Sequence, residues 1–318
     1  MSRQGQAIFA ERVTRFAQEV HDPRVGAVAR QVAAGVVVAV HGRPGVGRGT
    51  VARALAAEGV MIGHDADVDV HVIAEAVKPE DRAAIAASAS VRPTVVVLNK
   101  ADLIADPRGC AAHCRGLTGV ATVPMVAHLA LASIDDGAFS ALRELAASRV
   151  PLGSVDDVMS GPYRGLLEAL DMFGIAQAVR ASRAGADAAG IERVLHRRSG
   201  VREVVAALAP MLAEVGLQRV RRAVAALEVI AATADGDIAA QVDAFLRDDD
   251  TVLACMAAAV DAVQAAGMAV DPGDDPAAHL RRAAHWQRYR SGPVNPVHGA
   301  CGDDIVRGSL RLWRRVTA

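Results

Sequence analysis

The spacing of apolar residues changes several times along the first half of the chain, and each change predicts a different element. Apolar side chains recur every three or four positions in residues 4–20, which predicts an amphipathic helix. Asp22-Pro23 then favours the start of a second, shorter helix that reaches about residue 31. Four later runs are rich in β-branched residues, which predicts strands over 33–40, 68–75, 93–103 and 119–130.

Helices are predicted between these strands, over residues 50–58, from the Lys78-Pro79-Glu80 break through Ser88, and over 135–148. A helix or loop that contains two cysteines and a histidine follows the third strand. Strands that alternate with helices of this length indicate a parallel α/β sheet. Beyond Pro151 we predict helices only, because the apolar residues keep helical spacing, as at Leu217, Val220, Val224, Leu227 and Ile230.

These patterns predict three segments, in a chain that is long enough for two domains. Residues 1–32 form N-terminal helices, residues 33–150 form the α/β domain, and residues 151–318 form an all-helical bundle. We expect the N-terminal helices to pack with the C-terminal bundle.

Composition narrows the classes of partner. The chain has 318 residues, of which 52% are hydrophobic, and its many alanines favour helices. A formal net charge of −1 gives no overall field that would attract nucleic acid or an anionic membrane. The longest apolar run, residues 33–40, is too short to span a bilayer, and the charged first twenty residues do not resemble a signal peptide. We therefore expect a cytoplasmic protein that contacts membranes at most peripherally.

A glycine-rich segment lies between the first predicted strand and the next helix. Glycines in that position let the backbone turn so that its N–H groups and the helix N-terminus face an anion. The segment is similar to the phosphate-binding pattern G-x-x-x-x-G-K-[ST], with Gly42 and Gly47 at the two glycine positions. We predict that it binds nucleotide phosphates through Gly42, Gly45, Val46, Gly47, Arg48, Gly49 and Thr50.

Two positions depart from that pattern. Arg48 replaces the lysine, and its planar guanidinium is not equivalent to a compact ammonium group. Gly49 replaces the hydroxyl residue that binds magnesium, and Thr50 follows one position late. Thr50 is therefore a candidate magnesium ligand, and the sequence leaves open whether Arg48 supports the phosphate site or fills it.

A second motif, Asn99-Lys100-Ala101-Asp102, follows the third predicted strand directly. In this setting it resembles the N-K-x-D guanine-recognition motif of P-loop GTPases. The resemblance implies that Asp102 accepts two hydrogen bonds from the guanine ring and that the stem of Lys100 lies over the ring. It also implies that Asn99 ties the motif to the phosphate loop. A buried carboxylate of this kind discriminates against adenine, which would leave it unpaired.

Other parts of a complete GTPase are reduced or missing. Of the family's Ser-Ala-Lys-like turn, which contacts guanine through its backbone, only Ala127 is present. Between Thr50 and the strand at 68–75 there is neither an Asp-x-x-Gly motif nor a switch threonine. Asp65 or Asp67 is the remaining candidate carboxylate on the magnesium side, with Asp65 preferred. Without those groups we expect little or no GTP hydrolysis.

The order of the segments resembles that of bacterial dynamin-like GTPases of the isoniazid-inducible type, which have helices before and after the GTPase domain. The resemblance implies a truncated P-loop GTPase-like parallel sheet with helices on both faces, followed by an all-α helical bundle. It implies GTP or GDP as the ligand, with Mg²⁺ as a weaker expectation. It also implies assembly, either with a second copy of this chain or with a complete partner GTPase.

Two alternatives stay open. The glycine-rich loop is also similar to that of adenylate kinases, which would make the chain a nucleotide or small-molecule kinase, although Arg48 and the N-K-A-D motif disfavour this. Alternatively, neither loop binds nucleotide, and the chain is a scaffold for protein–protein interaction. The C-terminal segment 285–315 carries both tryptophans and several arginines. It is either a docking element or, as we expect, an amphipathic helix whose arginine stems cover the bundle.

Overall fold

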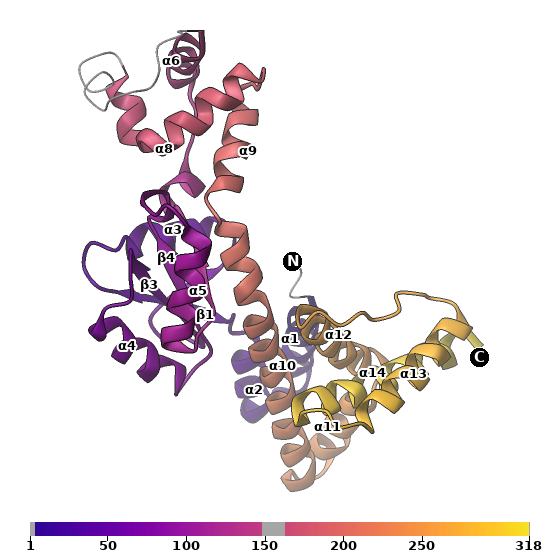
Figure 1. Cartoon of the computed structure of the whole chain (residues 1–318). Helices are drawn as coiled ribbons and strands as arrows, with labels where there is room; N and C mark the ends of the chain where they lie inside the picture. Colours follow the sequence, from indigo (N-terminus) through magenta and orange to yellow (C-terminus); the bar gives the residue numbers. More distant parts are fainter. Residues whose placement is uncertain (1–3, 148–162, 318) are drawn as a thin grey trace. The chain divides into compact units, whose positions relative to one another are not determined.

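The computed structural model describes residues 4–147 and 163–317. The chain divides into two compact units (Figure 1). Residues 37–208 form what we call the sheet unit, and residues 1–36 together with 209–318 form the helical unit. The division between Leu208 and Ala209 falls within helix α10 (Val201–Thr233).

The helical unit contains most of α10 and six further helices, α1 (Gln4–Val20), α2 (Pro23–Ala33), α11 (Asp237–Arg247), α12 (Asp249–Ala265), α13 (Pro276–Arg290) and α14 (Pro296–Thr317). Asp22, Asp248 and Asp275 cap α2, α12 and α13, because each carboxylate accepts hydrogen bonds from backbone N–H groups in the first turn. In α2 and α13 a proline follows the aspartate, at a position where its missing N–H removes no helical hydrogen bond. The Asp-Pro pairs of the sequence therefore start these two helices.

The N-terminal helices share one hydrophobic core with the helices that follow residue 209. Phe9, Val13 and Phe16 of α1 are buried in the same cluster as Leu217 and Leu227 of α10. The apolar face predicted for residues 4–20 is therefore buried against the C-terminal helices.

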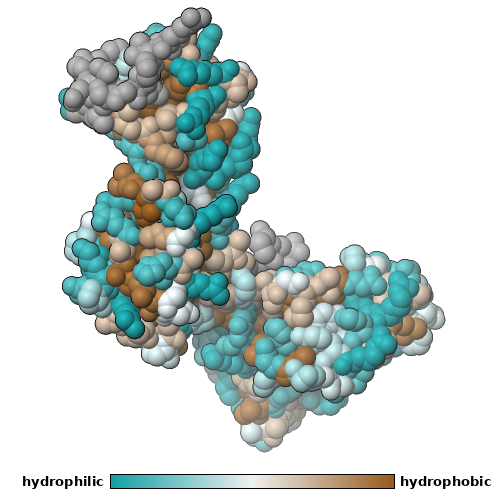
Figure 2. All heavy atoms as spheres, in the orientation of Figure 1, coloured by the Kyte–Doolittle hydropathy of each residue, from teal (hydrophilic) through white to brown (hydrophobic). Residues whose placement is uncertain are grey.

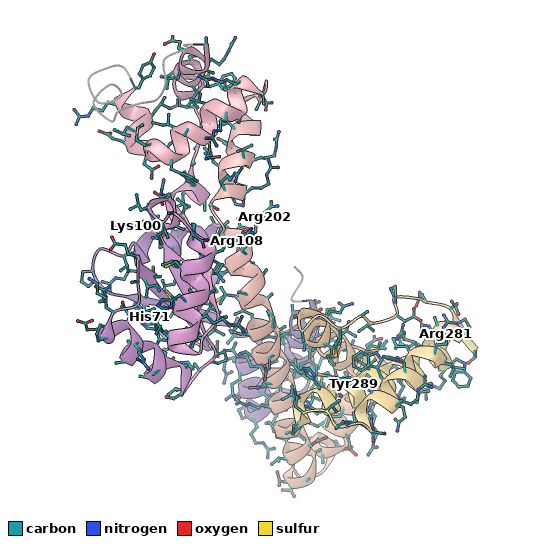
Figure 3. The ribbon with its side chains drawn as sticks, in the orientation of Figure 1. His71, Lys100, Arg108, Arg202, Arg281 and Tyr289 are labelled. Atoms are coloured by element: carbon teal, nitrogen blue, oxygen red, sulfur yellow. The ribbon has the colours of Figure 1, made fainter. Side chains whose placement is uncertain are left out.

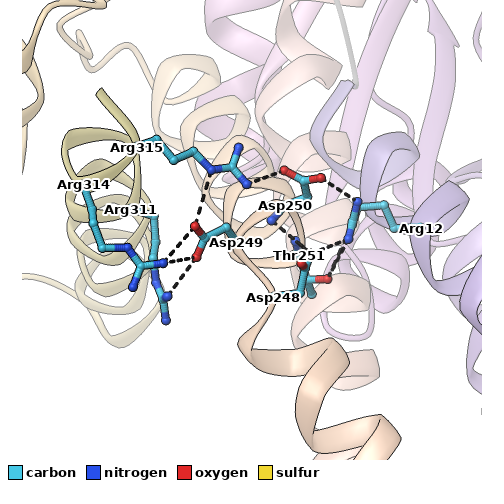
Figure 4. A network of polar contacts seen from close by, with 8 residues as sticks. All are labelled: Arg12, Asp248, Asp249, Asp250, Thr251, Arg311, Arg314 and Arg315. Atoms are coloured by element: carbon cyan, nitrogen blue, oxygen red, sulfur yellow. Dashed lines mark hydrogen bonds and ion pairs between the residues drawn. The ribbon is translucent and has the colours of Figure 1, made fainter. Parts of the chain in front are cut away.

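A group of charged side chains joins three helices of the helical unit (Figure 4). Asp249, in the first turn of α12, accepts hydrogen bonds from Arg311 at 2.8 Å and from Arg314 at 2.9 Å. The bond from Arg314 lowers the pKa of Asp249. The neighbouring Asp250 pairs with Arg12 of α1. The C-terminal helix α14 is thus attached to the bundle through its arginines.

Five parallel strands form the sheet in the order β2-β1-β3-β4-β5. They are β1 (Val37–Gly42), β2 (Met61–Ile62), β3 (Val68–Ala74), β4 (Thr94–Asn99) and β5 (Thr122–Pro124). Three of the four predicted strands are clearly longer than the observed ones; β1 begins late, for example, because α2 extends to Ala33. The two-residue β2 lies where no strand was predicted. The chain is therefore an α/β protein with a parallel sheet and a separate helical part, as the sequence predicted.

Helices α3 (Arg48–Ala57), α4 (Pro79–Ala89) and α5 (Pro107–Thr118) connect the strands. The chain runs from β1 through α3 to β2 in one direction, and from β3 through α4 and α5 towards β5 in the other. Since such crossovers are right-handed, α3 lies on one face of the sheet and α4 and α5 lie on the opposite face. Ile85 of α4 and Cys114 of α5 are buried with Ile73, Val96 and Leu98 of the strands on that second face.

Three further helices belong to the sheet unit rather than to the bundle: α6 (Asp136–Ala147), α8 (Arg164–Arg183) and α9 (Ala188–Arg198). The sequence placed the boundary at residues 150–151, which lie outside the described residues, and assigned everything beyond it to the bundle. The observed division comes later because α8 and α9 pack in one core with Ala101 and Val126, which follow the strands β4 and β5. These helices therefore pack against the turns that follow β4 and β5.

On the face that Figure 2 shows, hydrophilic and hydrophobic side chains are interspersed. Trp286 is buried, whereas Trp313 near the end of α14 is partly exposed. Within residues 4–147 and 163–317, no helix has the length and apolar character needed to cross a membrane.

Close packing between α12 and α14 leads to a stability prediction. A Cβ added at Gly308 would lie 2.6 Å from Met256 Cβ, so Gly308→Ala forces the two helices apart. Overpacking of this kind costs about 1–3 kcal/mol. We expect a lower urea midpoint, followed by tryptophan fluorescence, because both tryptophans lie in the helical unit.

Gly26→Ala is the matched control, because a Cβ there meets only the end of the Arg30 side chain at 3.5 Å. Alanine raises helix stability by up to about 1 kcal/mol relative to glycine, so this variant should unfold at the same or a higher urea concentration. Equal destabilisation by both substitutions would contradict the close α12–α14 packing.

Candidate functional site

The two sequence motifs meet at the carboxyl edge of the parallel sheet. The loop after β1 contains the glycine-rich segment, and Asn99 is the last residue of β4. The connections that leave β1 and β3, which are neighbours, run in opposite directions. In open α/β sheets such a switch point leaves a crevice beyond the strand ends where ligands bind. The topology therefore places both motifs beside the position where a ligand is expected.

The glycine-rich loop adopts backbone conformations that favour glycine. Gly45 and Gly47 have φ values of +85° and +87°. A Cβ at Gly47 would collide with the side-chain amide of Asn99. Helix α3 begins directly afterwards at Arg48, and its first-turn N–H groups point towards the loop. The loop therefore turns tightly and leads into the start of a helix, where backbone N–H groups have no intrahelical partners.

Arg48 lies back across this loop. Its Nη1 atom donates to the carbonyl oxygen of Gly42 at 3.2 Å, and the side chain is exposed to solvent. The neighbouring Gly49 is exposed and adds no side chain, and Thr50 is partly buried in the first turn of α3. The guanidinium thus stays at the mouth of the loop. It forms no ion pair with a carboxylate among the described residues, so it is available to bind an anion.

Asn99 connects three segments of the site. Its Nδ2 atom donates to the carbonyl oxygen of Val46 at 2.9 Å, and its Oδ1 atom accepts from the N–H of Ala127 at 3.0 Å. The side chain is 4% exposed, so both hydrogen bonds are shielded from water. The amide therefore fixes the glycine-rich loop and the turn after β5 relative to the end of β4.

Lys100 and Asp102 follow on the outer side of this junction. Lys100 is exposed and adopts a left-handed backbone conformation with φ +57° (Figure 3). Asp102 lies in the short turn η1 (Ala101–Leu103) and is partly buried. Burial raises the pKa of its carboxyl group, and no hydrogen bond from another described residue reaches that group. The carboxylate is therefore partly desolvated and short of hydrogen-bond donors, which is an unfavourable state unless a ligand supplies them.

Ala127 begins the turn η2 (Ala127–Leu131), which follows β5. Its N–H already donates to the side-chain oxygen of Asn99. This N–H is therefore not free to donate to a nucleotide base. The next residue, His128, carries a side chain that the sequence did not single out. Its Nε2 atom lies 2.7 Å from Asp171 Oδ2 and 3.2 Å from the carbonyl oxygen of Leu170.

Asp171 interrupts helix α8. Its backbone has φ +50° and ψ −176°, which is strained for a residue with a side chain. Its Oδ1 atom accepts hydrogen bonds from Phe173 N and Gly174 N at 3.0 and 3.1 Å, so the carboxylate caps the second half of the helix. Its other oxygen pairs with His128. Asp171 thus interrupts α8 and also accepts a hydrogen bond from His128.

The pair shifts the titration of both groups. The hydrogen bond that His128 donates to the Asp171 carboxylate raises the pKa of His128 and outweighs the opposing effect of burial. For Asp171, burial acts to raise the pKa, but the hydrogen bond from His128 and those from the backbone lower it. His128 therefore favours the imidazolium form and Asp171 the carboxylate form.

Asp65 is not brought to the phosphate loop. β2 pairs only with Val37 and Val38, at the start of β1. Asp67 Oδ2 accepts from Val37 N at 2.9 Å, so the turn that contains Asp65 lies beside the amino end of β1. The rest of β1 spans about 13 Å from there to the loop, at about 3.3 Å per residue. The predicted magnesium pair of Thr50 and Asp65 is thus separated by most of a strand.

Within the described ranges, no cluster of three or more His, Cys, Asp or Glu side chains has the arrangement of a metal site. A different carboxylate supports the loop. Arg43 donates to Asp81 Oδ1 at 2.9 Å, and Asp81 is buried on α4. His71 is buried 3.6 Å from the same oxygen, and burial lowers its pKa. These residues attach the glycine-rich loop to α4.

Sequence reasoning missed His128, Asp171 and the Arg43–Asp81 pair. For Asp171 a local signal existed, because an aspartate directly before apolar residues such as Met172 and Phe173 is typical of a helix N-cap. The other partners are brought together only by the fold.

Neither the protein-family models nor the curated proteins compared with this chain match it. The functional argument therefore depends on the motifs and on the geometry of the site.

The Asn99 junction gives the first prediction for the site. Asn99→Ala removes both side-chain hydrogen bonds and leaves Val46 O and Ala127 N without these partners. Each buried polar group left unpaired costs about 1–3 kcal/mol, so we expect a loss of about 2–5 kcal/mol in the stability of the sheet unit. Hydrogen exchange read out by peptide mass should show lost protection in the loop 43–50 and the turn 125–131. Unchanged exchange in both peptides would contradict the junction.

The His128–Asp171 pair gives a pH prediction. The raised pKa of His128 gives stability that is complete below its unfolded pKa of about 6.5 and is lost as the pH rises through the folded value. The lowered pKa of Asp171 gives stability that is complete above about pH 4 and is lost as the pH falls through its folded value. The pair therefore stabilises most between about pH 4 and pH 6.5.

Asp171→Asn tests this, because the amide oxygen can still cap α8 while the charge is lost. An NMR titration of the imidazole should show a lower pKa for His128 in the variant. The stability difference from the unmodified chain should be largest inside that pH window. Asp187→Asn, at the cap of α9, is the matched control and should leave His128 unchanged. An unshifted His128 titration in Asp171→Asn would rule out the pairing.

Proposed function

We propose that this chain is a guanine-nucleotide-binding protein with a truncated P-loop GTPase-like sheet unit and little or no hydrolytic activity. The observation that carries the proposal is the double hydrogen bond of Asn99, which joins the glycine-rich loop to the turns after β4 and β5. A phosphate loop and a base-recognition turn must lie at a fixed separation to hold one nucleotide, and this bond sets that separation.

Asp102 supports guanine as the base. Its carboxylate is partly desolvated, and burial raises its pKa, so a ligand that offers N–H donors relieves an existing penalty. Guanine presents two adjacent donors at N1 and N2, whereas adenine presents an acceptor at N1. Adenine would leave the carboxylate unpaired, which costs about 1–3 kcal/mol. The same argument disfavours the kinase alternative, which would use an adenine nucleotide.

We expect weak hydrolysis because the sheet is short on the β2 side of β1. Among the strands that the structure describes, β2 covers only the first two residues of β1 on that side. No described strand therefore carries a magnesium-binding or water-positioning group to the phosphate loop along that edge. Gly49 provides no hydroxyl beside Arg48. Phosphoryl transfer depends on positioning and on charge neutralisation, and here Arg48 is left as the main contributor.

We infer that a nucleotide that stays bound without being hydrolysed acts by promoting assembly of this chain with a partner. We therefore propose that the helical unit contacts a second copy of this chain or a complete partner GTPase, as in the dynamin-like arrangement that the segment order resembles. The ligand is GTP or GDP, and Mg²⁺ contributes weakly, since Thr50 lacks a carboxylate partner at Asp65.

A calorimetric titration with GTP, GDP and ATP, each with and without Mg²⁺, tests nucleotide binding. We expect both guanine nucleotides to bind and ATP to bind at least tenfold more weakly. Mg²⁺ should change the affinities little. Asp102→Asn should reduce the preference for guanine by about ten- to a hundredfold, which corresponds to the loss of one charge-assisted hydrogen bond.

Asp106→Asn is the matched control, because Asp106 caps the nearby α5 and its backbone contact tolerates an amide. It should leave the guanine preference unchanged. Binding of none of the nucleotides would refute the proposal and leave the scaffold alternative. Stronger binding of ATP would favour the kinase alternative.

GTP turnover by the purified chain should stay near the uncatalysed rate. Turnover at the rates of ordinary GTPases, abolished by Arg48→Ala, would show that the missing groups are replaced by others. Contaminating activity would survive the Arg48→Ala substitution, so the variant separates the two cases.

A further inference from the structure

The turns that carry Asp102 and His128 lie side by side. They follow the neighbouring strands β4 and β5. Two hydrogen bonds join them, from Ala101 N to Met125 O at 3.1 Å and from Ala127 N to Asn99 Oδ1 at 3.0 Å. The charges of Asp102 and His128 also influence each other. A carboxylate and an imidazole are therefore carried on two adjacent, hydrogen-bonded turns.

The contacts of His128 determine which edge of its ring is available. Nε2 lies against two acceptors, the carboxylate of Asp171 at 2.7 Å and the carbonyl oxygen of Leu170 at 3.2 Å. Nε2 must therefore carry a hydrogen in either protonation state. In the described parts of the chain, Nδ1 makes no hydrogen bond, and the side chain is 35% exposed. Nδ1 is thus free to contact a ligand.

The geometry points to His128 as a specificity-determining residue that donates from Nδ1 to a ring carbonyl, beside Asp102, which accepts from the adjacent ring N–H. This inference rests on the proposed nucleotide site and names the base class it takes. A carbonyl next to an N–H in one ring is a lactam, and among purines it is the 6-oxo group with its N1–H. The site is therefore built for 6-oxopurine nucleotides, which include those of guanine and hypoxanthine.

The inference assigns a role to Asp171 as a positioning residue. By holding the hydrogen on Nε2, it leaves Nδ1 with a hydrogen only when the ring is protonated. The neutral ring presents Nδ1 as an acceptor, which suits a 6-amino group instead. Among the described residues, the charged groups that act on His128 are Asp171 on α8 and Asp102 on η1. Preference for 6-oxo over 6-amino purines must therefore fall as the pH rises through the titration of His128.

The experiment measures dissociation constants of GDP, IDP and ADP between pH 5.5 and pH 8.5 by calorimetry. His128→Ala should weaken GDP and IDP by the same factor, about ten- to a hundredfold, because both carry the 6-oxo group. At the acid end of this range, where the ring is protonated, it should not weaken ADP. Asp102→Asn should weaken GDP more than IDP, since only GDP carries the 2-amino group.

Two further variants separate recognition from folding. His128→Asn places an amide N–H near the position of Nδ1. It should therefore bind IDP more tightly than His128→Ala does, and its IDP affinity should not depend on pH. Asp171→Asn should move the pH at which the IDP-over-ADP preference is lost to a lower value. His113→Ala, an exposed histidine on α5, is the control and should change none of the affinities.

The outcomes distinguish the two proposals. Guanine binding that depends on Asp102 but not on His128 overturns this inference and leaves the proposed function intact. An IDP-over-ADP preference that is independent of pH does the same. Absence of binding by all three nucleotides overturns both.

Discussion

The amide of Asn99 is the interaction on which the rest of the site depends. A single planar group donates to the loop after β1 and accepts from the turn after β5 while its own backbone ends β4. Because the group is buried, neither hydrogen bond can be exchanged for one to water without a penalty. Gly47 must lack a side chain for the same reason, since a Cβ would occupy the place of the amide. The conformation of the loop, the register of the turns and the spacing between the two halves of the site are therefore set together.

The elements that the sequence predicted best are those whose local pattern has one explanation. The runs at 33–40 and at β4 are continuous and rich in β-branched residues, and buried parallel strands are the structure in which such runs are stable. Strand ends were less certain, because residues such as Ala33 accept either a helix or a strand, and here α2 extends to include it. β2 is only two residues long and carries no periodicity to detect.

The division between the units and the His128–Asp171 pair could not be predicted, for a related physical reason. An alanine-rich amphipathic helix has the same pattern whether its apolar face meets a sheet or a bundle. Whether α8 and α9 belong to one or the other depends on contacts with Ala101 and Val126, which are distant in sequence. Asp171 likewise becomes informative only once His128 lies beside it. The positions of the two motif segments at strand ends were predictable in contrast, because a glycine-rich segment and a polar segment that directly follow an apolar run mark the end of a strand locally.

The helices that pack against the turns after β4 and β5 also explain how these turns are held in place by the protein itself. In the sheet unit, Ala101 and Val126 belong to a core that α6, α8 and α9 complete. The residues that follow them, Asp102 and Ala127, inherit their positions from that core rather than from a bound nucleotide. A ligand that binds there would lose little free energy to ordering the site, so more of the interaction energy would appear as affinity. Among the described residues, β2 is too short to bring a segment from that side of the sheet to the glycine-rich loop. If the chain binds nucleotide as we propose, a site preformed around the base would respond to the base more than to the phosphate state, and this would favour stable occupancy over a cycle of hydrolysis.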